Sequence, residues 1–180
     1  MMYIINKFLI IFFSISLLFF SCKKEELIEG CTEISAMNYV ASANSNDGSC
    51  IFAYDIAQGV WNIDSNCDDY TIPVIGTPIS IDDQLSEDIE IQGLGNNILY
   101  IEINETQMNA TIDNAGNVIV PSQTISLDMG FGPMDIDVEG NGIILSDNNG
   151  SMNLTYSFAI DVIPGFPISE SLDCTIILSR

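Results

Sequence analysis

The sequence predicts an all-β domain of antiparallel strands over residues 57–180. Apolar and polar residues alternate there with a period of two, and the longest such run extends from Ser151 to Asp161. This alternation is typical of strands with one buried and one solvated face. No convincing amphipathic helix interrupts the pattern, so we expect eight to ten short strands arranged as an up-and-down barrel or a sandwich. Turn sequences separate the runs at residues 94–97, 113–117, 139–142, 147–150 and 164–167.

The predicted strands follow one another along the chain, and each has an apolar face. The first is assigned from Gly59, Trp61 and Ile63, which share a face, and the last from Ile176, Leu178 and Arg180. Residues between these positions have the opposite parity, and we expect them to face solvent. The buried positions expected in the intervening strands are Ile89 and Ile91; Leu99, Ile101 and Ile103; Met134, Ile136 and Val138; and Met152, Leu154, Tyr156, Phe158 and Ile160.

The two ends of the domain favour a barrel over a sandwich. In an antiparallel pair without a bulge, opposed residue numbers have a constant sum, and Cys67 with Cys174 and Trp61 with Arg180 both give 241. One register therefore places a disulfide at one end of the pair and an arginine over the indole about 20 Å away at the other. Pairing of the first strand with the last closes the sheet into an antiparallel up-and-down β-barrel.

The tripeptide Gly59-Val60-Trp61, followed by the late Arg180, resembles the lipocalins, in which a Gly-x-Trp on the first strand is covered by an arginine from the end of the barrel. Together with Cys174, it makes the domain similar to small lipocalin-like barrels of Bacteroidetes lipoproteins, over about two thirds of the chain. The resemblance implies that Gly59, Trp61 and Arg180 close the barrel, and that the lumen can hold a small apolar ligand. The residues that we expect to line such a cavity are Tyr100, Met152, Leu154, Tyr156 and Phe158. The same side chains can instead fill the barrel, because eight strands leave an interior just wide enough for either arrangement.

The first 21 residues are typical of a signal peptide. The apolar run from Phe8 to Phe20 has 13 residues, whereas a membrane span needs roughly 20, and Lys7 precedes it. The segment that ends at Cys22 resembles a bacterial lipoprotein signal, which implies cleavage after residue 21 and lipidation of Cys22. Residues 22–30 are then expected to form an acylated tether.

Four further cysteines, an even number in an exported protein, predict two disulfides. Three pairings are open. We expect Cys31 with Cys50, because this pair encloses its own loop, and Cys67 with Cys174, because of the register above. The segment from Gly30 to Cys50 resembles a short cysteine-bounded repeat common in secreted Bacteroidetes proteins, which in this chain begins Gly-Cys-Thr-Glu and ends Asp-Gly-Ser-Cys. We expect residues 31–54 to form this disulfide-bounded module.

Composition excludes several function classes. The chain has 25 acidic and 4 basic residues and a net charge of −21, so we expect no nucleic-acid partner. It contains no histidine, which removes Ser-His and Cys-His catalysis. Asp135, Asp137 and Glu139 share one face of a predicted strand, where a solvated surface is favoured over a cation site. We therefore expect neither an enzyme nor a metal or other cofactor.

The sequence thus predicts a lipoprotein anchored in the outer membrane and facing the periplasm or the cell surface. The first functional hypothesis is a non-catalytic binding barrel for a small apolar ligand. The alternative is a structural or interaction module with a side-chain-filled barrel, whose partners are surface proteins or glycans. An internal apolar cavity favours the first hypothesis, and cell-surface accessibility favours the second.

Overall fold

The computed structural model describes residues 25–73, 76–103, 106–128, 132–163 and 165–180. The predicted signal peptide, residues 1–21, and the predicted lipidation site, Cys22, lie outside these residues. In the described part of the chain, no helix is both long enough and apolar enough to cross a bilayer.

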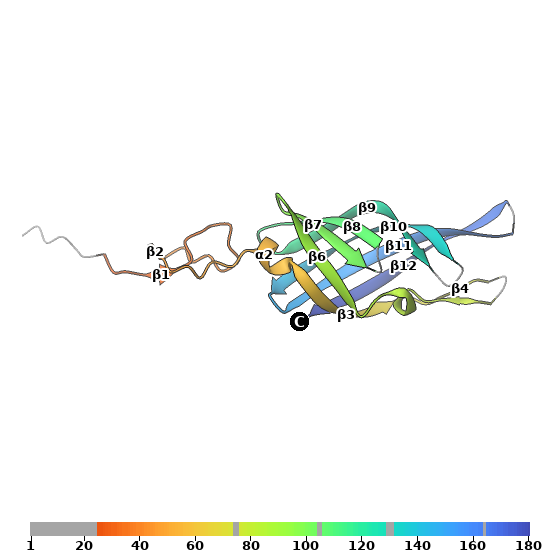
Figure 1. Ribbon diagram of the computed structural model, residues 1–180, viewed down its shortest axis with the longest axis horizontal. Coiled ribbons are helices and arrows are strands. Elements are labelled where there is room, and N and C mark those ends of the chain that lie inside the picture. The colour runs from red at the N-terminus through yellow and green to blue at the C-terminus, as the bar shows by residue number, and fades with distance from the viewer. Residues whose placement is uncertain (1–24, 74–75, 104–105, 129–131, 164) are drawn as a thin grey trace, which may run out of the picture.

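Eight strands form a closed antiparallel barrel, as predicted (Figure 1). Each barrel strand pairs with the next barrel strand along the chain, and the last pairs with the first, so the order is that of an up-and-down barrel. The strands are β3 (Gly59–Cys67), β6 (Asp88–Gly95), β7 (Ile98–Ile103), β8 (Thr106–Ile112), β9 (Asn117–Asp128), β10 (Pro133–Ser146), β11 (Asn149–Ile163) and β12 (Phe166–Ser179).

The register of the closing pair, β3 with β12, is the one predicted. Cys67 is paired with Cys174, and Asn62 with Ser179, so the residue numbers of each pair again add to 241. A disulfide joins Cys67 to Cys174, with 4.0 Å between their Cα atoms. This crosslink spans the seam at which the barrel closes.

Alternate residues of the barrel strands point into the lumen, where large side chains on one strand face small residues on the next. Gly140 and Gly142 of β10 are paired with Leu154 and Met152 of β11. A Cβ atom at Gly140 would collide with the carbonyl oxygen of Asn153 and lie 2.9 Å from Leu154 Cδ2. The two glycines thus leave room for the bulky side chains of β11 to fill this part of the barrel.

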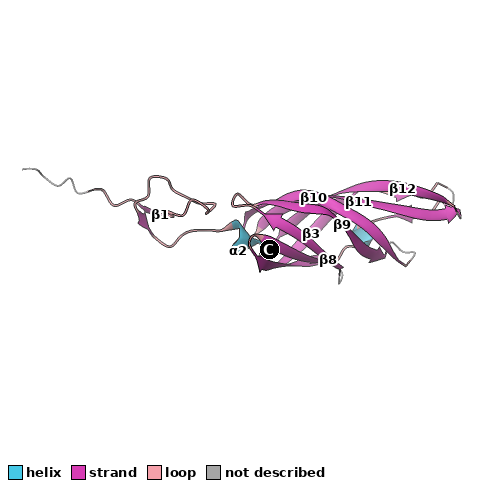
Figure 2. Cartoon of the chain, turned by 90° about the horizontal axis from the view of Figure 1, so that it is seen from above, coloured by secondary structure: helices cyan, strands magenta, loops and turns pink. Residues whose placement is uncertain are grey.

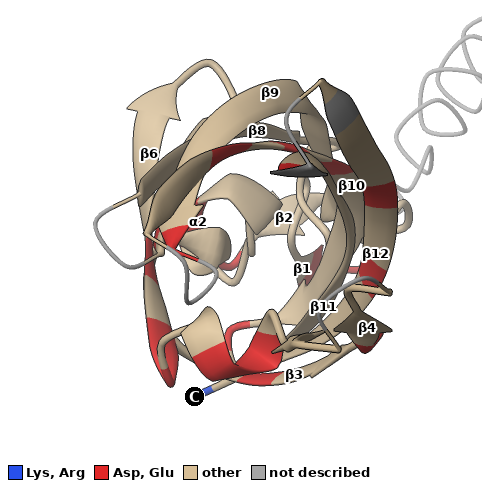
Figure 3. Ribbon diagram, turned by 90° about the vertical axis from the view of Figure 1, so that its right-hand side faces the viewer, with Lys and Arg blue, Asp and Glu red and all other residues tan. Residues whose placement is uncertain are grey.

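A short helix, α2 (Ala53–Ala57), closes one end of the barrel and lies within the outline of the ring in Figure 3. Ala53 and Ala57 are buried against the core. The Tyr54 hydroxyl accepts a hydrogen bond from the Gly95 amide, and Gln58 Oε1 accepts one from the Gly93 amide at 3.2 Å. These bonds fix the helix to the end of β6.

The chain between β3 and β6 packs against the core at the other end of the barrel, and we call its described residues, 68–73 and 76–87, the cap. It contains β4 (Tyr70–Thr71), β5 (Pro78–Ile79) and the 3₁₀ turn η2 (Asp82–Gln84). Ile72, Ile79 and Ile81 are buried in the barrel core, and Tyr70 meets Phe158 edge to face with ring centroids 6.1 Å apart. The cap is therefore held by apolar contacts with side chains that point into the lumen.

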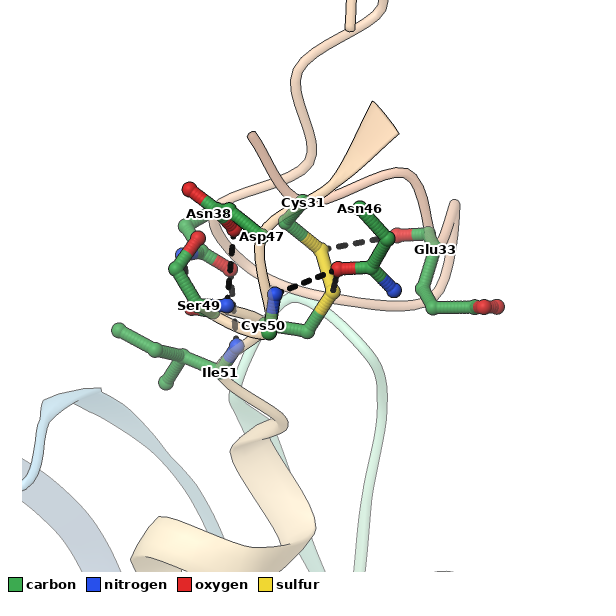
Figure 4. Close-up of a disulfide and its surroundings, with 9 residues drawn as sticks. Cys31, Glu33, Asn38, Asn46, Asp47, Ser49, Cys50 and Ile51 are labelled. Atoms are coloured by element: carbon green, nitrogen blue, oxygen red, sulfur yellow. Dashed lines mark hydrogen bonds between the residues drawn. A yellow bond between two sulfur atoms is a disulfide. The ribbon is translucent and has the colours of Figure 1, made fainter. Parts of the chain in front are cut away.

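Residues 25–52 form a small module outside the α2 end of the barrel (Figure 2). A short parallel bridge between β1 (Glu29–Gly30) and β2 (Ser45–Asn46) and the predicted disulfide between Cys31 and Cys50 hold it together. Figure 4 shows Asn38 beside the end of this loop, where its side chain donates to the Ser49 carbonyl at 2.6 Å and accepts from the Ile51 amide at 2.8 Å.

Candidate functional site

The candidate site is a small apolar void inside the barrel, under the cap. Its volume is about 10 Å³. Its lining comes from three barrel strands on one wall, from β11 on another and from the cap. The lining residues are Leu85, Ile103, Thr106, Met108, Ile125, Leu127 and Tyr156. No charged side chain is among these described lining residues.

Tyr156, one of the lining residues, carries an unusual buried group. The residue is 1% exposed and stands in the middle of β11, where it is paired with Val138 on one side and Leu172 on the other. Its hydroxyl oxygen is buried and has no hydrogen-bond partner. Burial raises the pKa of this hydroxyl above its usual range, so the group stays protonated and is a donor.

An unpartnered buried hydroxyl is costly, because it gives up its bonds to water and receives nothing in return. The cost is about 1–3 kcal/mol. Phenylalanine has the same ring without the hydroxyl, and it occupies the next inward position of β11, at Phe158. The buried phenol of Tyr156 is therefore a feature that packing alone does not explain.

The other polar lining residue, Thr106, is already engaged. Its Oγ1 donates to the Ser126 carbonyl at 2.8 Å. Tyr156 is consequently the one side chain among the described lining residues with a free hydrogen-bond donor.

The void is lined by residues on both sides of the β8–β9 seam, which has the fewest paired residues among the described seams of the barrel. Backbone pairing of these strands is restricted to Thr111 with Ile119 and Ile112 with Val118. Further along, the Gln123 side chain replaces the ladder: its Oε1 accepts from the Asn109 amide at 2.9 Å and its Nε2 donates to the Asn109 carbonyl at 2.8 Å. Here a side chain, rather than backbone pairing, joins the two strands.

Four of the five predicted ligand-contacting residues point into the lumen, but only one of these four lines the void. Tyr156 lines it, whereas Met152 and Leu154 pack opposite the β10 glycines and Phe158 contacts Tyr70 of the cap. All four are buried.

The prediction for Tyr100 is wrong. Leu99 and Ile101 of β7 are buried, so the intervening Tyr100 faces outward with Glu102. Sequence reasoning also missed most of the lining. Met108, Ile125 and Leu127 occupy inward positions that strand alternation would have identified, whereas Leu85 belongs to the irregular cap, which carries no periodic signal.

The predicted barrel-closing residues meet at the α2 end, away from the void. The Arg180 guanidinium carbon lies 3.9 Å from the Trp61 ring centroid, and Trp61 Nε1 donates to the Ala57 carbonyl at 2.8 Å. Gly59 has a φ of +112°, and a Cβ there would lie 3.2 Å from Arg180 Nη2. This cluster is structural, because its polar groups are paired within the protein.

The acidic residues lie on the outer surface. Two open grooves of about 660 and 620 Å³ follow the outer faces of strands β9–β12, and their carboxylates include Asp135, Asp137, Glu139 and Asp173. Hydroxyls pair with two of them across the strands, Thr124 with Asp137 at 2.6 Å and Thr155 with Asp173 at 2.7 Å. Within the described ranges, no group of three or more metal-binding side chains is close enough to hold an ion.

No protein-family model and no curated protein matches this chain. Among solved structures, the chain is similar to EF1p2_mFAP2b bound to DFHBI, with a TM-score of 0.43 and 14% sequence identity, over 71% of this chain and 96% of that chain. At this level the likeness adds nothing to the barrel assignment, which rests on the strand pairing.

Proposed function

We propose that this chain is a non-catalytic, lipid-anchored binding barrel that takes a small, mainly apolar molecule into its lumen. The observation that supports it is the unpartnered, buried hydroxyl of Tyr156, a residue that also lines the apolar void. Ligand sites are typically lined by apolar side chains, with a small number of polar groups, and the lining of this void is mainly apolar.

The cap offers a ligand a route into the lumen. Leu85 lines the void, comes from the cap rather than from a barrel strand, and is partly exposed. Displacement of this one side chain enlarges the void without breaking a strand ladder. A lumen that closes tightly when empty and opens beside a loop is consistent with a binding barrel.

The anchor is part of the proposal. Lipidation of Cys22 places the barrel on the outer membrane, facing the periplasm or the cell surface, with the module of residues 25–52 between membrane and barrel. Acyl chains contribute about 0.8 kcal/mol per buried methylene, so a multiply acylated terminus holds a water-soluble domain at the membrane.

A second candidate function is favoured by the size of the void. About 10 Å³ accommodates no more than a water molecule, whereas pockets for drug-sized ligands are roughly 300–1,000 Å³. On this view the barrel is a filled scaffold, and the protein is a structural or interaction module whose outer surface meets a protein or a glycan.

Native mass spectrometry followed by denaturing mass spectrometry separates the two candidates. The protein is purified from membranes in mild detergent, and its mass is compared before and after unfolding. A binding barrel shows a native adduct of defined mass that is lost on unfolding, and the Tyr156→Phe variant carries less of it. A native mass equal to that of the lipidated chain, in every preparation, supports the filled scaffold instead.

A further inference from the structure

The seam between β10 and β11 is open at the cap end of the barrel. Its ladder ends at the pair Asp137 and Ser157, although β10 begins already at Pro133 and β11 runs on to Ile163. Beyond that pair β10 stays paired with β9, and β11 with β12, so each strand keeps one neighbour and lacks the other. Figure 1 shows the β9–β10 end and the β11–β12 hairpin pointing apart there.

A groove of about 660 Å³ opens on the outer surface where this pairing stops. Asp135 and Ala159, which the same register would pair, both line it. On the inner side, Ile136 and Phe158 are buried, and Phe158 packs against Tyr70 of the cap. The core is therefore closed beneath the groove, and what the gap leaves open is the backbone edge of each strand.

The free edge of β11 lacks the features that natural proteins use to protect an edge. Such edges usually carry a lysine, a proline, an inward-pointing charge or a bulge. From Phe158 to Ile160 the sequence is Phe-Ala-Ile, and its pairing with β12 is regular. An unprotected edge of this kind can accept an extended peptide as an added strand.

The groove is also negatively charged. Asp135, Asp137 and Glu170 are among its described lining residues, which include no lysine or arginine. In the part of the chain that the structure describes, the one such residue is Arg180, which is held over Trp61 at the α2 end. A second copy of this chain, with a net charge of −21, would bring like charges together in the groove. A basic strand would instead be attracted by the three carboxylates.

We propose that the open seam between β10 and β11 binds an extended, basic segment of another protein, which pairs with the free edge of β11 as an added strand. The lysine or arginine side chains of that segment lie along the groove, close to Asp135 and Glu170, and the small side chains of Ser157 and Ala159 leave room for them. This interaction uses the outer wall of the barrel, so it does not depend on whether the lumen takes a ligand.

The test uses three peptides that differ in charge or in backbone donors. The probe is a peptide of alternating lysine and threonine, about eight residues long, which is the length of an ordinary strand. The second peptide has glutamate in place of lysine. The third is the probe methylated on every backbone nitrogen, so that it keeps the positive charge and loses its N–H donors. Calorimetry measures binding to the full chain in non-ionic detergent at about 0.15 M salt, and amide hydrogen exchange locates the site.

The proposal predicts that the lysine–threonine peptide binds and slows amide exchange within residues 157–160, whereas the other two peptides do not bind. Ala159→Lys adds a positive charge at an exposed position in the groove and should weaken binding about tenfold. Ile177→Lys is the matched control, because it adds the same charge at an exposed position of β12 that is paired on both sides, and it should bind as the parent chain does. Asp135→Asn/Glu170→Gln should also weaken binding, because it removes two of the three carboxylates.

Three results would overturn the inference. Failure of the lysine–threonine peptide to bind the parent chain removes the site. Equal binding of the N-methylated peptide means that the acidic surface attracts cations without an added strand. Slow exchange within residues 157–160 that depends on protein concentration, in the absence of peptide, means that a second copy of the chain occupies the edge.

Discussion

The Arg180 guanidinium lies over Trp61, with 3.9 Å between the guanidinium carbon and the ring centroid. Three carbonyls hold it there: Arg180 Nε donates to Val60 at 3.0 Å, Nη1 to Asp147 at 3.2 Å, and Nη2 to Gln58. The last residue of the chain is thus joined to the first barrel strand and to the β10–β11 turn. This contact closes the barrel at the α2 end, opposite the Cys67–Cys174 disulfide.

Replacement of Arg180 should reveal the contribution of this contact. We expect Arg180→Ala to lower the free energy of unfolding by about 2 kcal/mol, from lost cation–π attraction and hydrogen bonds. Arg180→Lys should lose most of the same amount, because an ammonium group cannot reach three diverging carbonyls as the guanidinium fork does. Denaturant titration monitored by the fluorescence of Trp61, the single tryptophan, measures both. Full recovery in Arg180→Lys would mean that charge alone is responsible.

The two disulfides should differ in their effect on the barrel. Cys67 and Cys174 are 107 residues apart, so we expect their double serine variant to lose up to about 4.7 kcal/mol of barrel stability on the chain-entropy model. The Cys31→Ser/Cys50→Ser variant is the matched control, since that pair, 19 residues apart, lies in the module outside the barrel. Thermal unfolding followed at Trp61 should shift strongly in the first variant and little in the second. Equal shifts would show that module and barrel unfold as one unit.

Gln123 should be essential to the β8–β9 seam. Its amide pairs with both backbone groups of Asn109, so Gln123→Glu keeps the size and the acceptor but removes the donor. We expect this variant to lose about 1–2 kcal/mol at neutral pH and to expose the Asn109 amide to faster hydrogen exchange. The loss relative to the parent chain should shrink in acid, because the introduced carboxyl is then protonated and again has a hydrogen to donate. Unchanged exchange at Asn109 would show that the seam is held by other contacts.

The β8–β9 turn should give a pH-dependent stability. Hydrogen bonds, first from the Asn117 side chain and then from backbone amides, hold the pKa of Asp113 below its ordinary value of 3.8. A carboxyl whose pKa is lowered in the folded state stabilises the fold above its unfolded-state pKa, and this contribution is lost as the pH falls through the folded-state pKa. We expect Asp113→Asn to be less stable than the parent chain at neutral pH. The difference should shrink once the pH falls below 3.8 and vanish below the folded-state pKa. Thermal unfolding of both chains across this pH range measures it, and a constant difference would argue against the carboxylate.

Much of the fold was predictable because strand alternation and register are local rules. The apolar sets of β6, β7, β10 and β11 are largely buried as expected, and the sum of 241 predicted both the β3–β12 register and the disulfide at Cys67 and Cys174. The same rule, applied strictly, would have placed Tyr100 outside, since its neighbours Leu99 and Ile101 are inside. Tyr100, although aromatic, lies on the outer face because of the pleat of β7.

The candidate site was less predictable, because it depends on contacts between distant segments. Leu85 reaches the void from a cap whose apolar residues, such as Ile72 and Ile79, follow no regular period. Gln123 gives no sign in the sequence that it replaces backbone pairing. That the Tyr156 hydroxyl lacks a hydrogen-bond partner can be recognised only in the folded barrel, where the opposite wall is in place.

A high-resolution crystal structure of the protein purified from its native membrane tests the central claim most directly, through the electron density around Tyr156 Oη. The account predicts non-protein density within hydrogen-bond distance of this oxygen, larger than a water molecule, with Leu85 turned away from the void. A lumen filled by side chains, with Tyr156 Oη donating to a protein acceptor, would contradict it.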